Sequence, residues 1–327
     1  EITLPTGIDN DGKERTAVCC LSSLNLDTYD EWKDNEQFVE DIMRFLDNVM
    51  TDFINKAPDE FANAKYSAMR ERSVGLGVMG LHSYFQQKGI PFGSVMSKVW
   101  NKKVFKNIQE KVDASSVKLA EERGACPDAA EYGINERFSN KTAIAPTASI
   151  SIICGGTSAG VEPISGNSYT HKTLSGSFNV RNKYLKKLLV KYKKDNEDIW
   201  SSITTNQGSV SHLKFLTNEE KDTFKTAFEI DQRWIIELGA DRTPHISQAQ
   251  SINVFVPADI HKKELHDIHF QAWKKGLKSL YYCRSKSIQR AENVTAGSST
   301  DVTKNVYKKN SEPENKDNNY EECLSCQ

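Results

Sequence analysis

Residues 251–283 read SINVFVPADIHKKELHDIHFQAWKKGLKSLYYC, and this stretch decides the fold class. Apolar residues alternate through 251–256, which predicts a strand. The next residues favour a helix that Asp259 can cap and that runs through Trp273. Residues 277–283 predict a second strand. A strand, a helix and a strand in that order, repeated in weaker form upstream, indicate an α/β architecture.

The rest of the chain shows the same mixture of helical periods and short apolar runs. Apolar residues recur every three to four positions over several long segments, which predicts amphipathic helices. A glycine-rich segment that continues as a helical pattern and a strand that runs into a proline complete the series. The predicted helices are 35–57, 98–123, 183–194 and 217–238, the last with Asn218 as its cap; the glycine-rich segment is 73–87 and the strand is 141–145.

Composition excludes several classes of protein. The chain has 327 residues, with 43 Lys and Arg against 44 Asp and Glu, so the net charge is −1. A protein that binds nucleic acid usually carries a basic excess, and none is present. No stretch approaches the ~20 apolar residues that a membrane-spanning helix needs. We therefore expect no nucleic acid and no membrane among the partners, and a cytoplasmic location (that of the host cell if the gene is a phage gene).

The seven cysteines suggest thiol chemistry rather than a disulfide scaffold, since their number is odd and no secretory signal precedes them. After about Ala296 the sequence is polar and almost without large aliphatic residues, which predicts a flexible tail at 296–327 after a folded unit at 1–295. The tail ends in Cys323-Leu-Ser-Cys326. This pair is too small for a zinc site but suffices for a dithiol that cycles to a disulfide. Two idle thiols are the alternative.

Another candidate follows the strand predicted at 141–145. It reads Pro146-Thr147-Ala148-Ser149-Ile150-Ser151. If a helix begins near Thr147, its unpaired N–H groups and the neighbouring hydroxyls can bind an anion. No lysine follows in the position of a P-loop, so the segment is not a Walker A motif. An ordinary helix cap is the alternative interpretation.

Four further residues have simple structural explanations when each is taken alone. Cys19 lies in an apolar context, where cysteine is common as a small buried hydrophobe. Tyr281 and Tyr282 are neighbours in a predicted strand, so one is expected in the core and one on the surface. A redox role for the two tyrosines requires their rings to be stacked. Glu1 is expected to be solvated.

Taken together, the motifs resemble the catalytic (large) subunit of a class I ribonucleotide reductase. The resemblance is greatest to the enzymes of T4-like phages. The resemblance covers nearly the whole chain and keeps the order of the family. The motifs are Glu1-Ile2-x-Leu4-Pro5-Thr6; Ala17-Val18-Cys19 with Leu21-Ser22 and Asn25-Leu26; Arg72-Ser73-x-Gly75-x-Gly77-Val78; Gly124-Ala125-Cys126-Pro127; Ala145 to Ser151; Gly160-Val161-Glu162-Pro163; Trp273-Lys274-Lys275-Gly276-Leu277-Lys278 with Tyr281-Tyr282; and the terminal dithiol.

The resemblance implies the C-terminal half of a ten-stranded α/β barrel with a flexible C-terminal tail. In the family the opening motif is Asn-x-Cys-x-Glu-Ile, so the radical-bearing Cys would precede Glu1. The resemblance also implies that the sites for ATP and dNTP effectors belong to an N-terminal half. We therefore expect a component of ribonucleoside-diphosphate reductase that is inactive by itself and needs this N-terminal half as a partner.

The resemblance also implies roles for the candidate residues. Glu1 resembles the base that accepts the proton of the 3′-hydroxyl. Cys19 resembles one of two thiols that reduce the substrate, the other being in the N-terminal half. Residues 146–151 resemble the site for the diphosphate of a ribonucleoside diphosphate.

Tyr281 and Tyr282 resemble the stacked pair that carries a radical from the small subunit. The radical then comes from a metal/tyrosyl cofactor of the small subunit, and no cofactor is expected in this chain. Cys323 and Cys326 resemble the tail dithiol that thioredoxin or glutaredoxin regenerates. The C-x-x-C spacing departs from the longer spacing of some relatives.

Two other functions stay open from sequence. One is a fragment of a cobalamin-dependent (class II) reductase, in which the tyrosine pair only packs. The other is a non-catalytic remnant that acts as a scaffold for an intact subunit. The remaining cysteines match no catalytic role and are interpreted as structural. They are Cys20, Cys126, Cys154 and Cys283.

Overall fold

The computed structural model describes residues 1–18, 20–173 and 176–285. Its helices are α1 (Tyr29–Trp32), α2 (Glu36–Lys56), α3 (Ala62–Glu71), α4 (Leu81–Gln87), α5 (Val95–Arg123), α6 (Pro127–Ala130), α7 (Ile150–Ile153), α8 (Lys183–Lys191), α9 (Glu197–Thr205), α10 (Asn218–Thr223), α11 (Gln232–Arg242) and α12 (Lys262–Lys274). Its strands are β1 (Gly7–Ile8), β2 (Glu14–Arg15), β3 (Leu21–Asn25), β4 (Gly75–Met79), β5 (Ser168–Thr173), β6 (Gly176–Arg181), β7 (Val254–Val256) and β8 (Cys283–Ser285).

The centre of the molecule is a row of parallel segments, each beside the next in chain order. β3 pairs with β4. Leu76 of β4 forms a parallel bridge to Thr142, and Ile144 forms one to Gln250. β7, which follows Gln250, pairs in parallel with β8. Helices lie between successive segments of the row, so the predicted α/β fold is confirmed.

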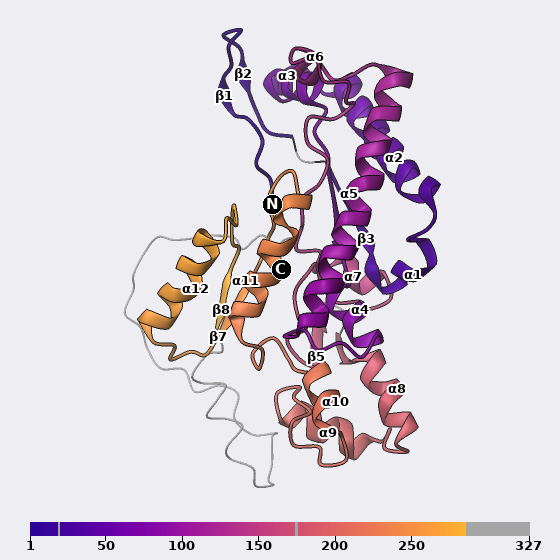
Figure 1. The fold of residues 1–327 in the computed structure, drawn as a ribbon, viewed down its shortest axis with the longest axis vertical. Helices are drawn as coiled ribbons and strands as arrows, with labels where there is room; N and C mark the ends of the chain where they lie inside the picture. Colours follow the sequence, from indigo (N-terminus) through magenta and orange to yellow (C-terminus); the bar gives the residue numbers. More distant parts are fainter. Residues whose placement is uncertain (19, 174–175, 286–327) are drawn as a thin grey trace.

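Two long helices cover one side of this row. Asn35 caps α2 by accepting hydrogen bonds from the N–H groups of Gln37 and Phe38, as the predicted helix at 35–57 requires. α5 begins at Val95, three residues before the predicted start, because the Ser94 side chain caps it. The apolar face of α2 packs against α5 in the main core. Figure 1 shows the two helices running along the same side of the molecule.

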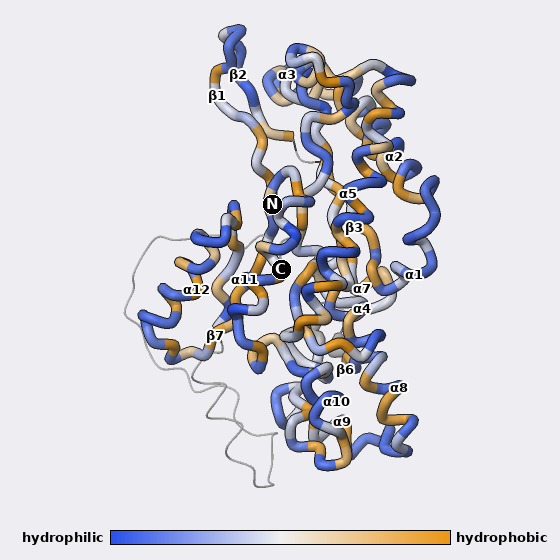
Figure 2. Tube along the Cα trace, viewed as in Figure 1, coloured by the Kyte–Doolittle hydropathy of each residue, from blue (hydrophilic) through white to orange (hydrophobic). Residues whose placement is uncertain are grey.

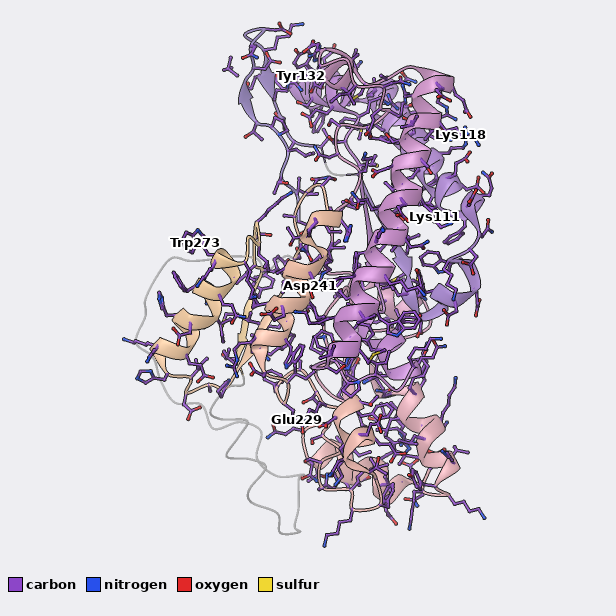
Figure 3. The ribbon with its side chains drawn as sticks, in the orientation of Figure 1. Lys111, Lys118, Tyr132, Glu229, Asp241 and Trp273 are labelled. Atoms are coloured by element: carbon purple, nitrogen blue, oxygen red, sulfur yellow. The ribbon has the colours of Figure 1, made fainter. Side chains whose placement is uncertain are left out.

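α11 packs on the other side of α5, and ion pairs flank this contact. Lys98 of α5 lies 2.9 Å from Glu237 and 3.4 Å from Asp241, both on α11. Lys102 lies 3.3 Å from the other oxygen of Asp241. Figure 3 shows Asp241 on α11 near α5 and places Trp273 at the far end of α12.

A second, smaller core joins α8, α9 and α10 beneath the β5–β6 hairpin. Trp200 is fully buried in it, and Leu185 and Leu189 of α8 point inward as predicted for the helix at 183–194, which ends at Lys191. Figure 2 shows polar and apolar residues alternating along α8, as in an amphipathic helix. Among the described helices, none is long and apolar enough to cross a bilayer.

The prediction of one helix over residues 217–238 is wrong in the middle of that range. α10 ends at Thr223 and α11 starts at Gln232, so the chain between them is not one continuous helix. Phe224 and Ala227 of this link are buried, and Asp231 starts α11 by accepting from the N–H of Arg233. The burial of this link and the Asp231 cap therefore break the single helix that the spacing of apolar residues predicted. The cap of α10 is Thr217, in a capping box with Glu220, and not Asn218.

The C-terminal elements are shifted from their predicted positions. α12 starts at Lys262, with His261 and not Asp259 as its cap. The strand predicted at 277–283 is instead β8 at Cys283–Ser285. Side-chain bonds explain the shift, because Lys278 donates to the carbonyls of Ser247 and Gln248 at 2.6 and 2.7 Å. These bonds fix the position of the chain after α12. It therefore joins the parallel row as a strand only from Cys283 onward.

Candidate functional site

The candidate site is organised by residues 248–253, which lie inside the parallel row. Gln248, Gln250, Ser251 and Asn253 are polar, yet each is at most 5% exposed. On one side the Ser251 N–H donates to the carbonyl of Ile144 at 2.9 Å. On the other side the segment pairs with the chain that carries the two tyrosines. Buried polar groups must be hydrogen-bonded, so this segment acts as a junction for several distant parts of the chain.

The first of these parts is Glu1. We expected this residue to be solvated, but it is half-buried. Its carboxylate accepts a hydrogen bond from Ser251 Oγ at 2.5 Å. Its main-chain carbonyl accepts from the N–H of Ala249 at 2.9 Å, and the N–H of Thr3 donates to the Gln248 side chain at 3.2 Å. A carboxylate held in this way keeps lone pairs available and can accept a proton from a bound hydroxyl.

The second part is the tyrosine pair, which precedes β8. The ring centroids of Tyr281 and Tyr282 lie 4.1 Å apart with an angle of 50° between the ring planes, so the rings are in contact but tilted, and the stacking expected for a redox pair is not found. The expectation that these neighbours point to opposite faces is therefore wrong. The reason is that neither residue lies within a regular strand: the Tyr281 N–H donates to Ile252 at 2.8 Å, and the Tyr282 N–H donates to the side chain of Asn253 at 3.0 Å.

The third part is the loop after the Ile144 segment. Thr147 adopts a positive φ of 55°, and its Oγ1 accepts from the N–H of Gly160 at 2.7 Å. The helix after the loop begins at Ile150 and not near Thr147, and it has only four residues. The loop turns because the Ser151 N–H donates to the Thr147 carbonyl at 3.1 Å.

The loop amides are available to a ligand. Within the described part of the chain, the N–H groups of Ala148, Ser149 and Ile150 donate to no protein acceptor. Ser149 and Ile150 are exposed, whereas Ser151 is buried and its Oγ donates to the Ala148 carbonyl at 3.1 Å. A short run of unpaired amides beside a hydroxyl is suited to phosphate oxygens.

Two side chains from other elements hold the end of this loop. The Asn25 amide, at the carboxyl end of β3, donates to the Cys154 carbonyl at 3.3 Å. Lys183, at the start of α8, donates to the Gly155 carbonyl at 3.3 Å and also contacts the buried carboxylate of Asp27. The loop therefore lies at the carboxyl edge of the parallel row, where ligands of α/β folds usually bind.

The predicted thiols cannot be placed in the same way. Cys19, Cys323 and Cys326 lie outside the described residues, as does the predicted boundary between 295 and 296. Of the cysteines interpreted as structural, Cys126 is buried, and burial raises the pKa of its thiol. Cys154 and Cys283 are exposed, so packing does not account for them.

Sequence reasoning missed Ser251 and Asn253, and it assigned no role to Glu162. Asn253 donates to Glu162 through its main-chain N–H at 2.5 Å and through its side chain at 2.9 Å. Burial raises the pKa of the Glu162 carboxyl, against the opposing effects of the two Asn253 bonds and of Arg284. The available signal was the run of polar residues at 248–253 directly before β7, in a segment that the fold buries; the strand predicted at 251–256 begins only at Val254.

Comparisons with known proteins agree with this architecture. Residues 1–136 and 127–283 match the family model described as "Ribonucleotide reductase, barrel domain". The chain belongs to the ribonucleotide reductase barrel family. This confirms the resemblance seen in the sequence motifs.

The relatives of this reductase-family chain are large subunits. The ribonucleoside-diphosphate reductase large subunit of Invertebrate iridescent virus 6 is 49% identical over 301 residues, covering 90% of this chain and 31% of the relative. The large subunit of Caenorhabditis elegans is 30% identical over 98% of this chain and 44% of the relative. Among solved structures, the class Id ribonucleotide reductase alpha subunit of Actinobacillus ureae superposes with a TM-score of 0.80 at 41% identity, covering 91% of this chain and 54% of that one.

The chain therefore spans about a third to a half of the length of the curated relatives named above. The match to the bacterial structure extends across most of the chain. It supports the arrangement of the parallel row, because the two chains share both the fold and a substantial part of their sequence.

Proposed function

We propose that this chain supplies the C-terminal part of the catalytic site of a class I ribonucleoside-diphosphate reductase, which reduces ribonucleoside diphosphates to 2′-deoxyribonucleoside diphosphates for DNA synthesis in the cytoplasm. The observation that carries the proposal is the convergence on residues 248–253. Glu1, the tyrosine pair and the segment that leads into loop 146–151 all bond to this one segment. A proton acceptor, a pair of oxidisable rings and an anion site are the parts that such a reaction needs.

In the proposed reaction a thiyl radical on a Cys of the N-terminal half takes the 3′-hydrogen of the ribose. Glu1 accepts the proton of the 3′-hydroxyl and returns it when the product forms, and the 2′-hydroxyl leaves as water with a proton from one of the two thiols. Cys19 and a second Cys of the N-terminal half supply two electrons and two protons and form a disulfide. The 3′-hydrogen then returns to the sugar, which regenerates the thiyl radical.

The tyrosine pair is proposed to deliver the radical. Contact at 4.1 Å between the ring centroids of Tyr281 and Tyr282 suits transfer of an electron from one ring to the next. The proposed source is the metal/tyrosyl cofactor of a separate small subunit. The similarity to a class Id alpha subunit favours class I over a cobalamin-dependent reductase, in which the tyrosines would only pack.

The amides of loop 146–151 are proposed to bind the diphosphate. The exposed amides of Ser149 and Ile150 would donate to phosphate oxygens, while Thr147, fixed by Gly160, keeps the loop in its turned form.

The tail and the partners complete the proposal. Cys323 and Cys326 would reduce the disulfide formed by Cys19 through thiol exchange, and thioredoxin or glutaredoxin would regenerate them. The tail at 296–327 would be a unit separate from 1–295. The N-terminal half would provide the remaining barrel strands and the sites for ATP and dNTP effectors.

Reconstitution tests this function. The chain is combined with the N-terminal half, a small subunit and a dithiol reductant, and deoxynucleotide formation is measured. We expect turnover that is abolished by Cys19→Ser and retained by Cys126→Ala, a control that removes a buried thiol outside the site. No turnover from the complete mixture, or full activity of Cys19→Ser, would favour the non-catalytic scaffold.

A further inference from the structure

The side chain of Asn253 bridges a carboxylate and the tyrosine pair. Its Nδ2 donates to Glu162 at 2.9 Å, and its Oδ1 accepts from the Tyr282 N–H at 3.0 Å. The main-chain N–H of Asn253 donates to the other oxygen of Glu162 at 2.5 Å. The next residue completes the contact, because the Val254 N–H donates to the Tyr282 carbonyl at 3.0 Å. Tyr282 is thus fixed through both its N–H and its carbonyl.

Glu162 determines which way the Asn253 amide faces. An ionised carboxylate can only accept hydrogen bonds, so the NH₂ end of the amide must point toward Glu162. The oxygen end is then directed at the N–H of Tyr282. If Asn253 turned over, two donors would face each other at Tyr282, and two acceptors would face each other at Glu162. The carboxylate therefore selects the one orientation that holds the tyrosine.

Burial raises the pKa of Glu162 overall, and two arginines near the pair oppose this effect. Arg284 lies over the Tyr282 ring, with its guanidinium carbon 5.4 Å from the ring centroid. Arg284 and the buried Arg242 favour the negative form of Glu162, and both of its oxygens accept hydrogen bonds from Asn253, as an ionised carboxylate does. Asn253 itself is only 5% exposed, so water cannot easily replace the bonds that it makes.

We infer that Glu162, acting through Asn253, is a positioning residue for the Tyr281–Tyr282 pair. It fixes the main chain of Tyr282 against β7 and so sets the contact between the two rings. The effect of Glu162 on turnover rests on the function proposed above, but the effect of Glu162 on the position of Tyr282 does not.

An exchange of polarity between the two partners provides the test. Glu162→Gln places an NH₂ group opposite the NH₂ of Asn253, and Asn253→Asp places two carboxylates opposite each other. The double variant Glu162→Gln/Asn253→Asp restores a donor opposite an acceptor, and the carboxylate introduced at position 253 still accepts from the Tyr282 N–H. Glu197→Gln is the matched control, since Glu197 is exposed and pairs with Arg181 on the far side of the second core.

Amide hydrogen exchange at residues 281–285, and for comparison over α5 and α12, is measured in the assembled enzyme, together with kcat and KM. We expect each single variant to speed exchange at Tyr282 about 10-fold, as loss of one buried hydrogen bond does. We expect kcat to fall about 10-fold or more with KM for the nucleotide little changed, because the ring contact and not substrate binding is disturbed. The double variant should recover both values to within about 3-fold.

Three results would overturn the inference: unchanged exchange at Tyr282 in both single variants, an equal rise of exchange across α5 and α12, or a double variant as impaired as the singles. If the wild-type assembly has no turnover while exchange at Tyr282 still follows this pattern, the proposed function fails and the positioning role stands.

Discussion

At the scale of single residues, the contact between two aromatic rings is the most specific feature of this chain. Tyr281 and Tyr282 lie side by side because their N–H groups bond to Ile252 and Asn253 on one neighbouring segment. An adjacent pair in a regular strand would diverge to opposite faces. The departure from regular strand geometry is therefore what brings the rings together.

If the pair carries a radical, each hydroxyl is essential. Tyr281→Phe and Tyr282→Phe, in the reconstituted enzyme, should each lower kcat at least ~100-fold, since a phenyl ring lacks the phenolic O–H that is lost on oxidation. Folding should be unaffected, as measured by thermal unfolding. Tyr192→Phe is the control, because Tyr192 bonds to Glu220 in the second core. Near-normal turnover of both pair variants would instead favour a cobalamin-dependent enzyme.

Gly77 shows how closely the parallel segments approach each other. A Cβ at this position would lie 2.2 Å from the carbonyl oxygen of Ala143, in the neighbouring segment. Gly77→Ala should therefore push two segments of the row apart and cost about 2–3 kcal/mol of unfolding free energy. Gly133→Ala is the control: its Cβ meets nothing within 4 Å, so its φ of 69° alone should cost about 1 kcal/mol. Equal losses in urea unfolding would contradict this explanation.

At the scale of elements, one buried carboxylate joins α2 to the ends of α3 and α5 and to the chain after α6. Asp47 of α2 is fully buried and lies 2.6–2.9 Å from Arg72 after α3, Arg123 at the end of α5, and Arg137. Burial raises the pKa of Asp47, but the hydrogen bonds and charges of the three arginines outweigh it and the pKa is lowered overall. The carboxylate is thus a structural anion at neutral pH.

Removal of this charge should destabilise the packing of α2, α3 and α5. Asp47→Asn leaves three partly buried cations without their anion and should cost about 3–5 kcal/mol. Because the folded-state pKa is below the ordinary value, the stabilisation by Asp47 is present above about pH 4 and is lost as the pH falls through the folded-state pKa. Asp52→Asn, which breaks an exposed pair with Lys56, should change stability by less than about 0.5 kcal/mol. Thermal unfolding of both variants at pH 7 and pH 3 checks the difference.

At the scale of the whole molecule, the described parallel row is open at both ends. β3 pairs only with β4 and β8 only with β7 among the residues described. Unpaired strand edges recruit other strands. This agrees with a chain that covers about a third to a half of its large-subunit relatives.

We therefore expect the chain on its own to self-associate and to become monodisperse with the N-terminal half. Co-expression followed by size-exclusion chromatography measures this, with the N-terminal half omitted from the matched sample. A monodisperse, cooperatively melting monomer in the absence of the N-terminal half would show that the edges need no partner.

The sequence by itself determined the features that depend on neighbouring residues. The Asn35 cap, the apolar stripe of α2 and the end of α5 at Gly124 follow from contacts within one or two helical turns. The ordered motifs also identified the family. Local rules failed at 217–238, because Phe224 is buried by contacts with distant parts of the chain. They failed at 277–283 because Lys278 bonds to a carbonyl 31 positions away.

Only the tertiary structure decided the site. Glu1 and Ser251 are 250 positions apart, and nothing in either local sequence brings them together. The parallel row does so, because its segments pair through main-chain hydrogen bonds that link remote residues. The same pairing aligns Asn253 between Glu162 and Tyr282, an arrangement that no spacing along the chain encodes.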